Sequence, residues 1–368
     1  MCRFAAIAAV VFIASCGAGS GTERELPAGP PTSAAPSDNV LFVSFAQSNL
    51  VAAFRLGTDG FLPSKPFSTM SVDSPRTIVV HDDILFVGST DRISSATIAA
   101  DGSLPAQPTA VNTPIDDGDI SAMLVVDDVL FAAYTETELL ISYRLEGGHI
   151  PPNILSTSGE SFSNYLSMDE FDGYIYVHAP GLGRIDTFRI LGDGSIDDFP
   201  EPQLPEVDLF GCEALKIHDG IIYAASSIRD RINSYTIDAV GLPEGLDDGE
   251  DPISHTRAEE RYVDLAINDD ILYAAAYNKG RVDAYQIDPV DGTLLEQAPI
   301  SITEYDTGLY PTSVVLLDGF LYVSQAGRDR IDGFTVNADG RLSGFPATST
   351  DPIEPGFPNK IIHGVYPP

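Results

Sequence analysis

Apolar and polar positions along the chain follow one pattern that repeats seven times. Each copy contains an apolar stretch, a turn, a second apolar stretch with a central aromatic residue, a polar loop and a third stretch of alternating apolar residues. The clearest copy spans residues 313–342. A repeat of this length with several short strands is typical of a β-propeller. The central aromatic residue recurs every 44 to 50 residues, at Phe42, Phe86, Phe131, Tyr176, Tyr223, Tyr273 and Tyr322.

Each copy is predicted to form four strands. In the second copy, residues 77–80 form an apolar inner strand, and residues 84–87, 93–98 and 109–112 form the next three. Asp-Gly pairs favour hairpin turns between such strands, because glycine adopts positive φ without steric cost. The mature chain shows no useful helical periodicity, so the fold class is all-β. The turn pairs are Asp59-Gly60, Asp101-Gly102, Gly147-Gly148, Asp193-Gly194, Asp291-Gly292 and Asp339-Gly340, with Val240-Gly241 in the remaining copy.

The two ends of the repeat predict how the ring closes. The first copy starts directly with the aromatic strand at residues 39–44, whereas an unassigned apolar segment, residues 359–363, follows the last copy. Pairing of this segment with the first aromatic strand would remove an exposed sheet edge. The sequence therefore predicts a seven-bladed β-propeller over residues 39–368, built of four-stranded blades and closed by a C-terminal strand.

The N-terminus resembles a bacterial lipoprotein signal. Residues 1–15 carry one positive charge, Arg3, and an apolar run too short to span a membrane as a permanent helix. The run ends in Ile-Ala-Ser-Cys-Gly, which resembles a lipobox and implies that Cys16 is lipidated. An ordinary secretory signal cleaved near Cys16 is the alternative. Because Gly17 and not aspartate follows Cys16, the resemblance implies a lipid anchor in the bacterial cell envelope, at the outer membrane.

Residues 16–38 are expected to form a flexible tether. They are rich in glycine, proline, serine and alanine and lack apolar periodicity. A flexible coil of this length reaches roughly 25 Å. Such a tether would hold the ring near a membrane without fixing its orientation.

The composition is strongly acidic. Aspartate and glutamate number 54 against 20 lysines and arginines, which gives a formal net charge of −34. This charge repels nucleic acid and anionic lipid head groups, so neither is an expected partner. It attracts cations or basic partners, although a solubilising surface is the simpler explanation. The acidic loop at residues 245–251 could hold Ca²⁺ through oxygen ligands, but it lacks the spacing of an EF-hand, and we expect no required cofactor.

Arginine recurs at the start of the third strand in five of the seven copies, and aspartate follows two positions later in three of them. Residues two positions apart lie on the same side of a strand. A ligand site on a ring needs asymmetry, so a residue repeated in most blades indicates scaffolding. We therefore expect salt bridges within or between blades. The arginines are Arg92, Arg184, Arg231, Arg281 and Arg330, and the aspartates are Asp186, Asp283 and Asp332.

The inner strand lines the central channel of a propeller, and the alternation of side chains along it predicts which residues face inward. Lys216 and Asp264 are expected there, on neighbouring blades. His81, His218 and His363 are expected at one end of the channel. Only two of these histidines would belong to neighbouring blades, so we expect hydrogen bonds to water and no metal site.

The opposite mouth of the channel carries polar and aromatic residues that share no rule of the repeat. Polar and aromatic side chains that converge in a concave surface are the default candidate for a ligand site. The alternative is that these residues differ between copies only because loops vary. Glu213 and Asp264 are the candidate acid or base groups if the ring is a hydrolase. The cations able to stabilise an oxyanion are Arg76, Lys216 and Lys279. The candidate ligand-binding residues are Arg76, Glu213, Lys216, Tyr277, Asn278, Lys279, Gln325 and Arg328.

The order of strands and turns resembles the seven-bladed lactonase-type propellers, which include 6-phosphogluconolactonase of the propeller type. The matching residues build the blade: Leu321-Tyr322-Val323, Ile331, Phe334 and Asp339-Gly340-Arg341-Leu342. The resemblance implies the fold and a lactone hydrolase activity. A phosphorylated sugar lactone is a cytoplasmic metabolite and needs a basic pocket. This chain is expected to be exported, is strongly acidic and has only four lysines. No Gly-x-Ser-x-Gly, His-Glu-x-x-His or phosphate-loop motif is present.

Two hypotheses from different classes remain. The favoured one is a monomeric, non-catalytic envelope lipoprotein whose ring binds a small molecule, a glycan or a protein at the channel mouth. The alternative is a hydrolase that acts on a lactone or ester outside the cytoplasm. A lipid anchor would be the only contact with a membrane in either case.

Overall fold

The described part of the chain lies within the unit Ala35–Pro368. The computed structural model describes residues 36–112, 118–135, 137, 139–147, 149–150, 153–158, 165–179, 182–197, 212–226, 231–245, 255–256, 261–295, 299–303 and 309–366. The predicted signal peptide, Cys16 and residues 16–35 of the predicted tether fall outside this description, as do residues 246–251 of the acidic loop. In the described part, no helix has the length and apolarity needed to cross a membrane.

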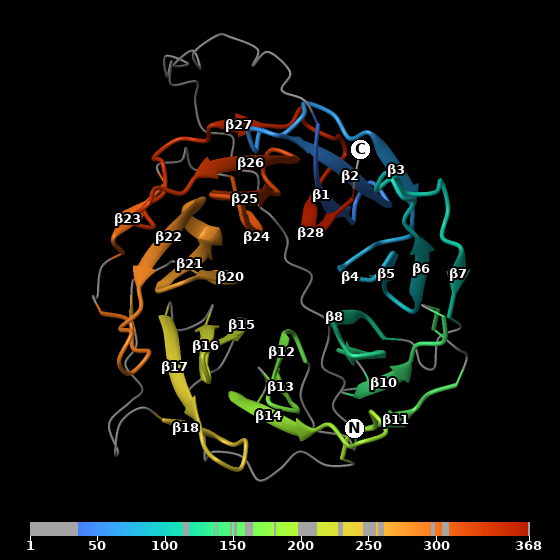
Figure 1. The fold of residues 1–368 in the computed structure, drawn as a ribbon, viewed down its shortest axis with the longest axis vertical. Coiled ribbons are helices and arrows are strands. Elements are labelled where there is room, and N and C mark those ends of the chain that lie inside the picture. Colours follow the sequence, from blue (N-terminus) through green and yellow to red (C-terminus); the bar gives the residue numbers. More distant parts are fainter. Residues whose placement is uncertain are drawn as a thin grey trace, which may run out of the picture. The chain divides into compact units, whose positions relative to one another are not determined.

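Seven antiparallel sheets surround a central axis, as Figure 1 shows. From the axis outward, blade 1 contains β28 (Pro358–Val365), β1 (Pro36–Phe45), β2 (Leu50–Gly57) and β3 (Ser68–Ser71). Blade 2 contains β4 (Thr77–His81), β5 (Ile84–Gly88), β6 (Ile93–Thr97) and β7 (Ala110–Val111), and blade 3 contains β8 (Ile120–Val126), β9 (Val129–Tyr134), β10 (Leu140–Arg144) and β11 (Ser156–Thr157). Blade 4 contains β12 (Met168–Phe171), β13 (Tyr174–Ala179) and β14 (Arg184–Arg189).

The remaining three blades follow the same order. Blade 5 contains β15 (Cys212–His218), β16 (Ile221–Ser226), β17 (Arg231–Ile237) and two short outer strands, β18 (Pro243–Gly245) and β19 (His255–Thr256). Blade 6 contains β20 (Tyr262–Asn268), β21 (Ile271–Ala276), β22 (Arg281–Gln286) and β23 (Ser301–Ile302). Blade 7 contains β24 (Pro311–Leu317), β25 (Phe320–Gln325), β26 (Arg330–Thr335) and β27 (Thr348–Ser349). The predicted all-β, seven-bladed propeller is confirmed.

The C-terminal strand β28 closes the ring by pairing with β1 in blade 1. Leu41 lies opposite His363, Phe42 opposite Ile362 and Val43 opposite Ile361 in an antiparallel ladder. Ile361 is buried in a cluster with Leu41 and Val43. The expected closing segment is therefore correct, and it extends a few residues further at its C-terminal end than the sequence indicated. β1 also starts earlier than expected, at Pro36, so the last residues of the predicted tether belong to the sheet.

The repeated aromatic residue of the second strand joins each blade to the next. In blades 4 to 7 this residue is tyrosine, and its hydroxyl donates to the carbonyl of the turn glycine in the following blade. Blades 1 to 3 carry phenylalanine there. The four hydrogen bonds are Tyr176 to Gly241 (2.9 Å), Tyr223 to Gly292 (2.7 Å), Tyr273 to Gly340 (2.8 Å) and Tyr322 to Gly60 (2.6 Å).

Gly60 shows why glycine is needed at these turns. Its φ is +78°, a conformation that other residues rarely adopt. A Cβ atom at this position would also lie 2.4 Å from the Phe320 ring of blade 7. The turn therefore requires glycine for both its own backbone and its contact with the neighbouring blade.

Three of the five repeated third-strand arginines form the expected salt bridges with aspartates two residues later. Nε to Oδ1 distances are 2.6 Å for Arg184 and Asp186, 2.7 Å for Arg281 and Asp283, and 2.9 Å for Arg330 and Asp332. All three aspartates are fully buried. Burial raises the pKa of Asp332, and the Arg330 guanidinium acts in the opposite direction. Arg92 pairs with Asp91 instead.

Deleting residues 359–368 should lower the free energy of unfolding by about 5 kcal/mol or more. This is a large part of the ~5–15 kcal/mol by which a native protein is typically stable. The deletion removes buried Ile361 and exposes the edge of β1. Chemical denaturation and light scattering would show loss of the cooperative transition and aggregation. A control that lacks only residues 367–368 should unfold like the full chain, and a 359–368 deletion that matched this control would contradict closure by β28.

Candidate functional site

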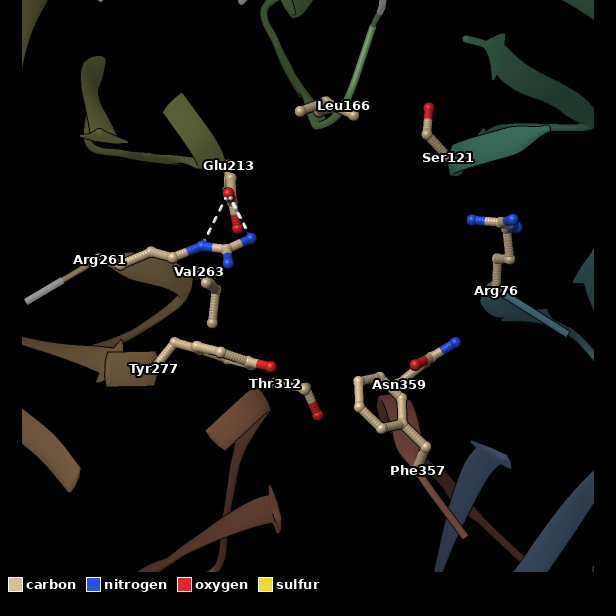
Figure 2. Close-up of a pocket in the computed structure, with 10 residues that line it drawn as sticks. All are labelled: Arg76, Ser121, Leu166, Glu213, Arg261, Val263, Tyr277, Thr312, Phe357 and Asn359. Carbon is tan, nitrogen blue, oxygen red and sulfur yellow. Dashed lines mark hydrogen bonds and ion pairs between the residues drawn. The ribbon is translucent and has the colours of Figure 1, made fainter. Parts of the chain in front are cut away.

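The seven inner strands start at the same mouth of the channel, and the segments around these starts enclose a cavity of about 430 Å³. Every blade contributes at least one residue to its wall. Figure 2 shows these side chains arranged around the opening. They are Phe357 and Asn359 of blade 1, Arg76 of blade 2, Ser121 of blade 3, Leu166 of blade 4, Glu213 of blade 5, Arg261, Val263 and Tyr277 of blade 6, and Thr312 of blade 7.

β-Bulges near the starts of the inner strands place several of these side chains on the cavity wall. A bulge inserts an extra residue opposite one partner and re-aims its side chain. The residues at the shifts include Ser121, Glu213, Val263 and Thr312, and all four line the cavity. The pairing register shifts between Ile120 and Ala122 in β8, Cys212 and Ala214 in β15, Tyr262 and Leu265 in β20, and Pro311 and Ser313 in β24.

Glu213 is held by an ion pair with Arg261 of the neighbouring blade. Nη2 of Arg261 lies 2.8 Å and Nε lies 3.0 Å from Oε1 of Glu213, and both contacts are drawn in Figure 2. The guanidinium also lies 4.8 Å from the ring centroid of Tyr277. Tyr277 in turn stacks on Tyr310, with 4.9 Å between centroids and 29° between the ring planes. Arg261 thus fixes the position of the carboxylate, and the two stacked tyrosines support Arg261.

Tyr277 presents its hydroxyl to the cavity (Figure 2). Burial raises the pKa of this phenol above its usual range, and the Arg261 guanidinium acts in the opposite direction. The hydroxyl therefore stays protonated at neutral pH and can donate a hydrogen bond. Tyr277 starts the short 3₁₀ helix η1 (Tyr277–Lys279), which ends at Gly280 with φ of +63°.

A second ion pair lies on the other side of the cavity. Nη2 of Arg76 is 2.6 Å from Oδ2 of Asp119 in the next blade. Figure 2 shows the Arg76 guanidinium facing the opening across from Glu213 and Arg261. Its side chain is 48% exposed, whereas that of Asp119 is 23% exposed. The arginine is therefore the member of this pair that a ligand would meet.

Three residues directly before inner strands have a strained backbone. Arg261, Tyr310 and Phe357 precede β20, β24 and β28 with φ values of +26°, +50° and +64°. Residues other than glycine rarely adopt positive φ, and such strain gathers at functional sites. Two of the three line the cavity, and Tyr310 packs on the wall residue Tyr277.

The two aliphatic hydroxyl groups on the described wall are bonded to backbone carbonyls. Ser121 Oγ lies 2.5 Å from the carbonyl of Tyr165, and Thr312 Oγ1 lies 2.5 Å from that of Pro358. Neither hydroxyl contacts a histidine or carboxylate among the described residues, so neither has the activating base of a catalytic nucleophile. Glu213 is the one carboxylate on the described wall.

The structure brings three of the predicted ligand-binding residues together on the wall: Arg76, Glu213 and Tyr277. Asn278 and Lys279 follow Tyr277 in η1 and lie outside the lining set. Arg328 lies between β25 and β26, also outside it. Gln325 is fully buried at the end of β25, and its amide has no hydrogen-bond partner in the described structure.

Lys216 and Asp264, which were predicted to face the channel on neighbouring blades, each form an ion pair with another residue. Lys216 Nζ lies 3.8 Å from Asp169 in blade 4. Asp264 receives hydrogen bonds from Ser313 Oγ at 2.6 Å and the backbone amide of Val314 at 3.0 Å. Its Oδ2 also lies 3.1 Å from Lys360 Nζ of β28. Asp264 therefore links blade 6 to blade 7 and to the closing strand, and it does not line the cavity.

The channel histidines do not converge. His81 Nε2 lies 3.5 Å from Asp128, and His218 Nε2 lies 3.7 Å from Asp219. His363 lies opposite Leu41 in the closing ladder. Within the described ranges, no group of three histidine, cysteine, aspartate or glutamate residues has the geometry of a metal site.

Sequence reasoning missed the other seven residues of the described wall. Arg261 is the most consequential omission, because it holds Glu213. One available signal was its position: like Arg76, it stands directly before an inner strand. The other omitted wall residues are Ser121, Leu166, Val263, Thr312, Phe357 and Asn359.

No protein-family model and no curated protein matches the sequence. Among solved structures, a candidate 6-phosphogluconolactonase from Bacteroides fragilis matches with a TM-score of 0.72 and 15% identity over 91% of this chain and 100% of that one. One from Bacteroides uniformis matches with a TM-score of 0.73 and 15% identity over 89% and 100%. The periplasmic gluconolactonase of Pseudomonas aeruginosa matches with a TM-score of 0.72 and 15% identity over 89% and 99%. The resemblance to lactonase-type propellers is thus confirmed at the level of the fold.

Asp264→Asn should lower the free energy of unfolding by about 1–3 kcal/mol, because a charged hydrogen-bonded partner of Lys360 is lost. Lys360→Met should couple to it, and a double-mutant cycle by chemical denaturation would measure an interaction of about 0.5 kcal/mol or more. Asp83→Asn, in an exposed turn, serves as the control. Purely additive effects would contradict the link between blade 6 and the closing strand.

Proposed function

We propose that the protein hydrolyses a lactone in the mouth cavity. The observation that carries this proposal is the oriented Glu213 carboxylate, which is held by Arg261 on one wall and lies across the opening from the Arg76 guanidinium (Figure 2). A carboxylate base opposite a cation is what hydrolysis of a cyclic ester requires. The shared fold with proteins described as lactonases supports the same class of reaction.

Glu213 would act as the general base. Both bonds from Arg261 end on Oε1, which leaves Oε2 for a water molecule. Glu213 takes a proton from this water while the water oxygen attacks the lactone carbonyl carbon. The guanidinium of Arg76 stabilises the negative charge that develops on the carbonyl oxygen. The bond between the carbonyl carbon and the ring oxygen then breaks, Glu213 returns its proton to the leaving oxygen, and a hydroxy acid is released.

A ring that binds its ligand without converting it is the second candidate. The hydrogen bonds of the wall favour it, because Ser121 and Thr312 are bonded to backbone carbonyls and Asp264 is occupied by blade-to-blade contacts. Glu213 then remains the single carboxylate on the described wall. A small molecule, a glycan or a protein segment would occupy the cavity in this case.

Glu213→Gln should lower the rate of lactone hydrolysis by about 100-fold or more, because it removes the general base. The purified domain would be assayed against aliphatic, aromatic and sugar lactones, with Asp83→Asn, in an exposed turn outside the cavity, as the control. Turnover by the parent and the control together with loss in Glu213→Gln would support the proposal. Absence of turnover with every lactone would favour the binding ring.

We also propose that the protein is a monomer in the bacterial cell envelope, anchored by lipid on Cys16 at the outer membrane. The proposal rests on the lipobox-like sequence at residues 13–17 and on the composition of residues 16–38. The acidic composition argues against nucleic acid as a partner. The reaction proposed above uses water and the residues named, without a cofactor.

Cys16→Ser should release the protein from the membrane fraction or block its processing, because the acyl chain supplies the membrane affinity. Cell fractionation and the mass of the mature chain would measure this. Cys212→Ser is the matched control, and it should remain in the membrane fraction. Unchanged membrane partition of Cys16→Ser would contradict the anchor.

A further inference from the structure

We infer that the mouth cavity selects an uncharged, hydroxylated cyclic lactone over a phosphorylated one. This inference rests on the proposed function, because it names the substrate class of the same site. Two observations carry it: each arginine of the cavity is paired with a carboxylate, and one wall offers an aromatic ring beside polar groups.

Each arginine of the cavity already has a carboxylate partner at hydrogen-bond distance. Arg76 lies 2.6 Å from Asp119, and Arg261 lies 2.8 Å from Glu213. The two guanidinium groups and the two carboxylates sum to zero charge. A phosphate dianion would have to displace a carboxylate from its arginine or lie unbalanced beside it, and like charges a few ångströms apart repel strongly where water is partly excluded.

The charge of the whole chain acts in the same direction. With a formal net charge of −34, the protein repels a dianion during approach and in the mouth. An uncharged ligand does not experience this repulsion. A phosphorylated substrate would therefore need a cation that no carboxylate already balances, whereas both arginines of the described wall are paired with carboxylates.

The wall near blade 1 is suited to the apolar face of a hydroxylated ring. Phe357 lines the cavity with a half-buried side chain, held there by a backbone φ of +64°. Asn359 follows two residues later on the same wall (Figure 2). The Tyr277 hydroxyl points into the same cavity (Figure 2). An aromatic face bordered by amide, phenol and guanidinium groups can pack on ring C–H groups and bond to hydroxyls at once.

A matched pair of ligands tests the inference independently of turnover. The 1,5-lactam of gluconic acid is uncharged and resists hydrolysis, and its 6-phosphate differs only by the added charge. Calorimetry should show that the uncharged lactam binds at least ten times more tightly. Equal or tighter binding of the phosphorylated lactam, or no binding of either, would overturn the inference.

The corresponding lactones separate this inference from the proposed function. Binding of the uncharged lactam without hydrolysis of either lactone would contradict hydrolysis and leave the selectivity standing. Faster hydrolysis of the phosphorylated lactone, by kcat/KM, would leave hydrolysis standing and overturn the selectivity.

Two variants test the physical causes. Asp119→Asn frees Arg76 and should shift the ratio of the two lactam affinities at least tenfold toward the phosphorylated form. Asp83→Asn makes the same charge change at the far end of blade 2 and should leave the ratio unchanged.

Phe357→Ala should weaken binding of the uncharged lactam about tenfold. Its control is Phe345→Ala, which changes an exposed phenylalanine in blade 7 and should leave the affinity unchanged. Identical behaviour of each variant and its control would overturn the proposed causes and with them the inference.

Discussion

The contact between each blade and the next is the interaction on which the rest of the structure depends. A blade buries its apolar faces only against its neighbours, so the ring is stable only when it closes. The aromatic residue of the second strand and the turn glycine of the following blade make this contact repeatedly, as in Tyr322 and Gly60. Between blades 1 and 2 the C-terminal segment takes part, because Tyr366 packs edge-on against Phe42 and beside Gly102.

Closure also builds the cavity. The strand β28 that completes blade 1 begins at the mouth, where Phe357 and Asn359 line the wall. Its Lys360 is tied to Asp264 of blade 6. The segment that holds the ring together therefore supplies part of the candidate site, and the site is expected to exist only in the closed ring.

The sequence predicted the fold well because the residues that form each blade recur in every copy of the repeat. The aromatic positions, the Asp-Gly turns and residues 359–363 indicated seven blades and their closure, and the third-strand arginines were correctly interpreted as scaffolding. The site was predicted in part. Arg76, Glu213 and Tyr277 were identified from their departure from the repeat, and all three line the cavity.

The remaining features depend on bulges and on contacts between blades, which leave no signal in a single copy. Alternation along β20 predicted that Asp264 faces the channel, on the blade next to that of Lys216, but it could not show which groups Asp264 meets at the register shift between Tyr262 and Leu265. Its carboxylate bonds to Ser313 of β24 and to Lys360 of β28, which are the inner strands of blades 7 and 1. Arg261 was missed for a related reason, since its partner Glu213 lies on another blade.

The most direct test of the central claim is a crystal structure of the protein with the uncharged lactam bound. The mouth cavity should hold the lactam with its carbonyl oxygen within hydrogen-bond distance of the Arg76 guanidinium, about 3.2 Å or less, and Glu213 on the side from which water attacks. A lactam found at the opposite face of the ring or between the outer strands, with the mouth empty, would contradict the claim that this cavity is the functional site.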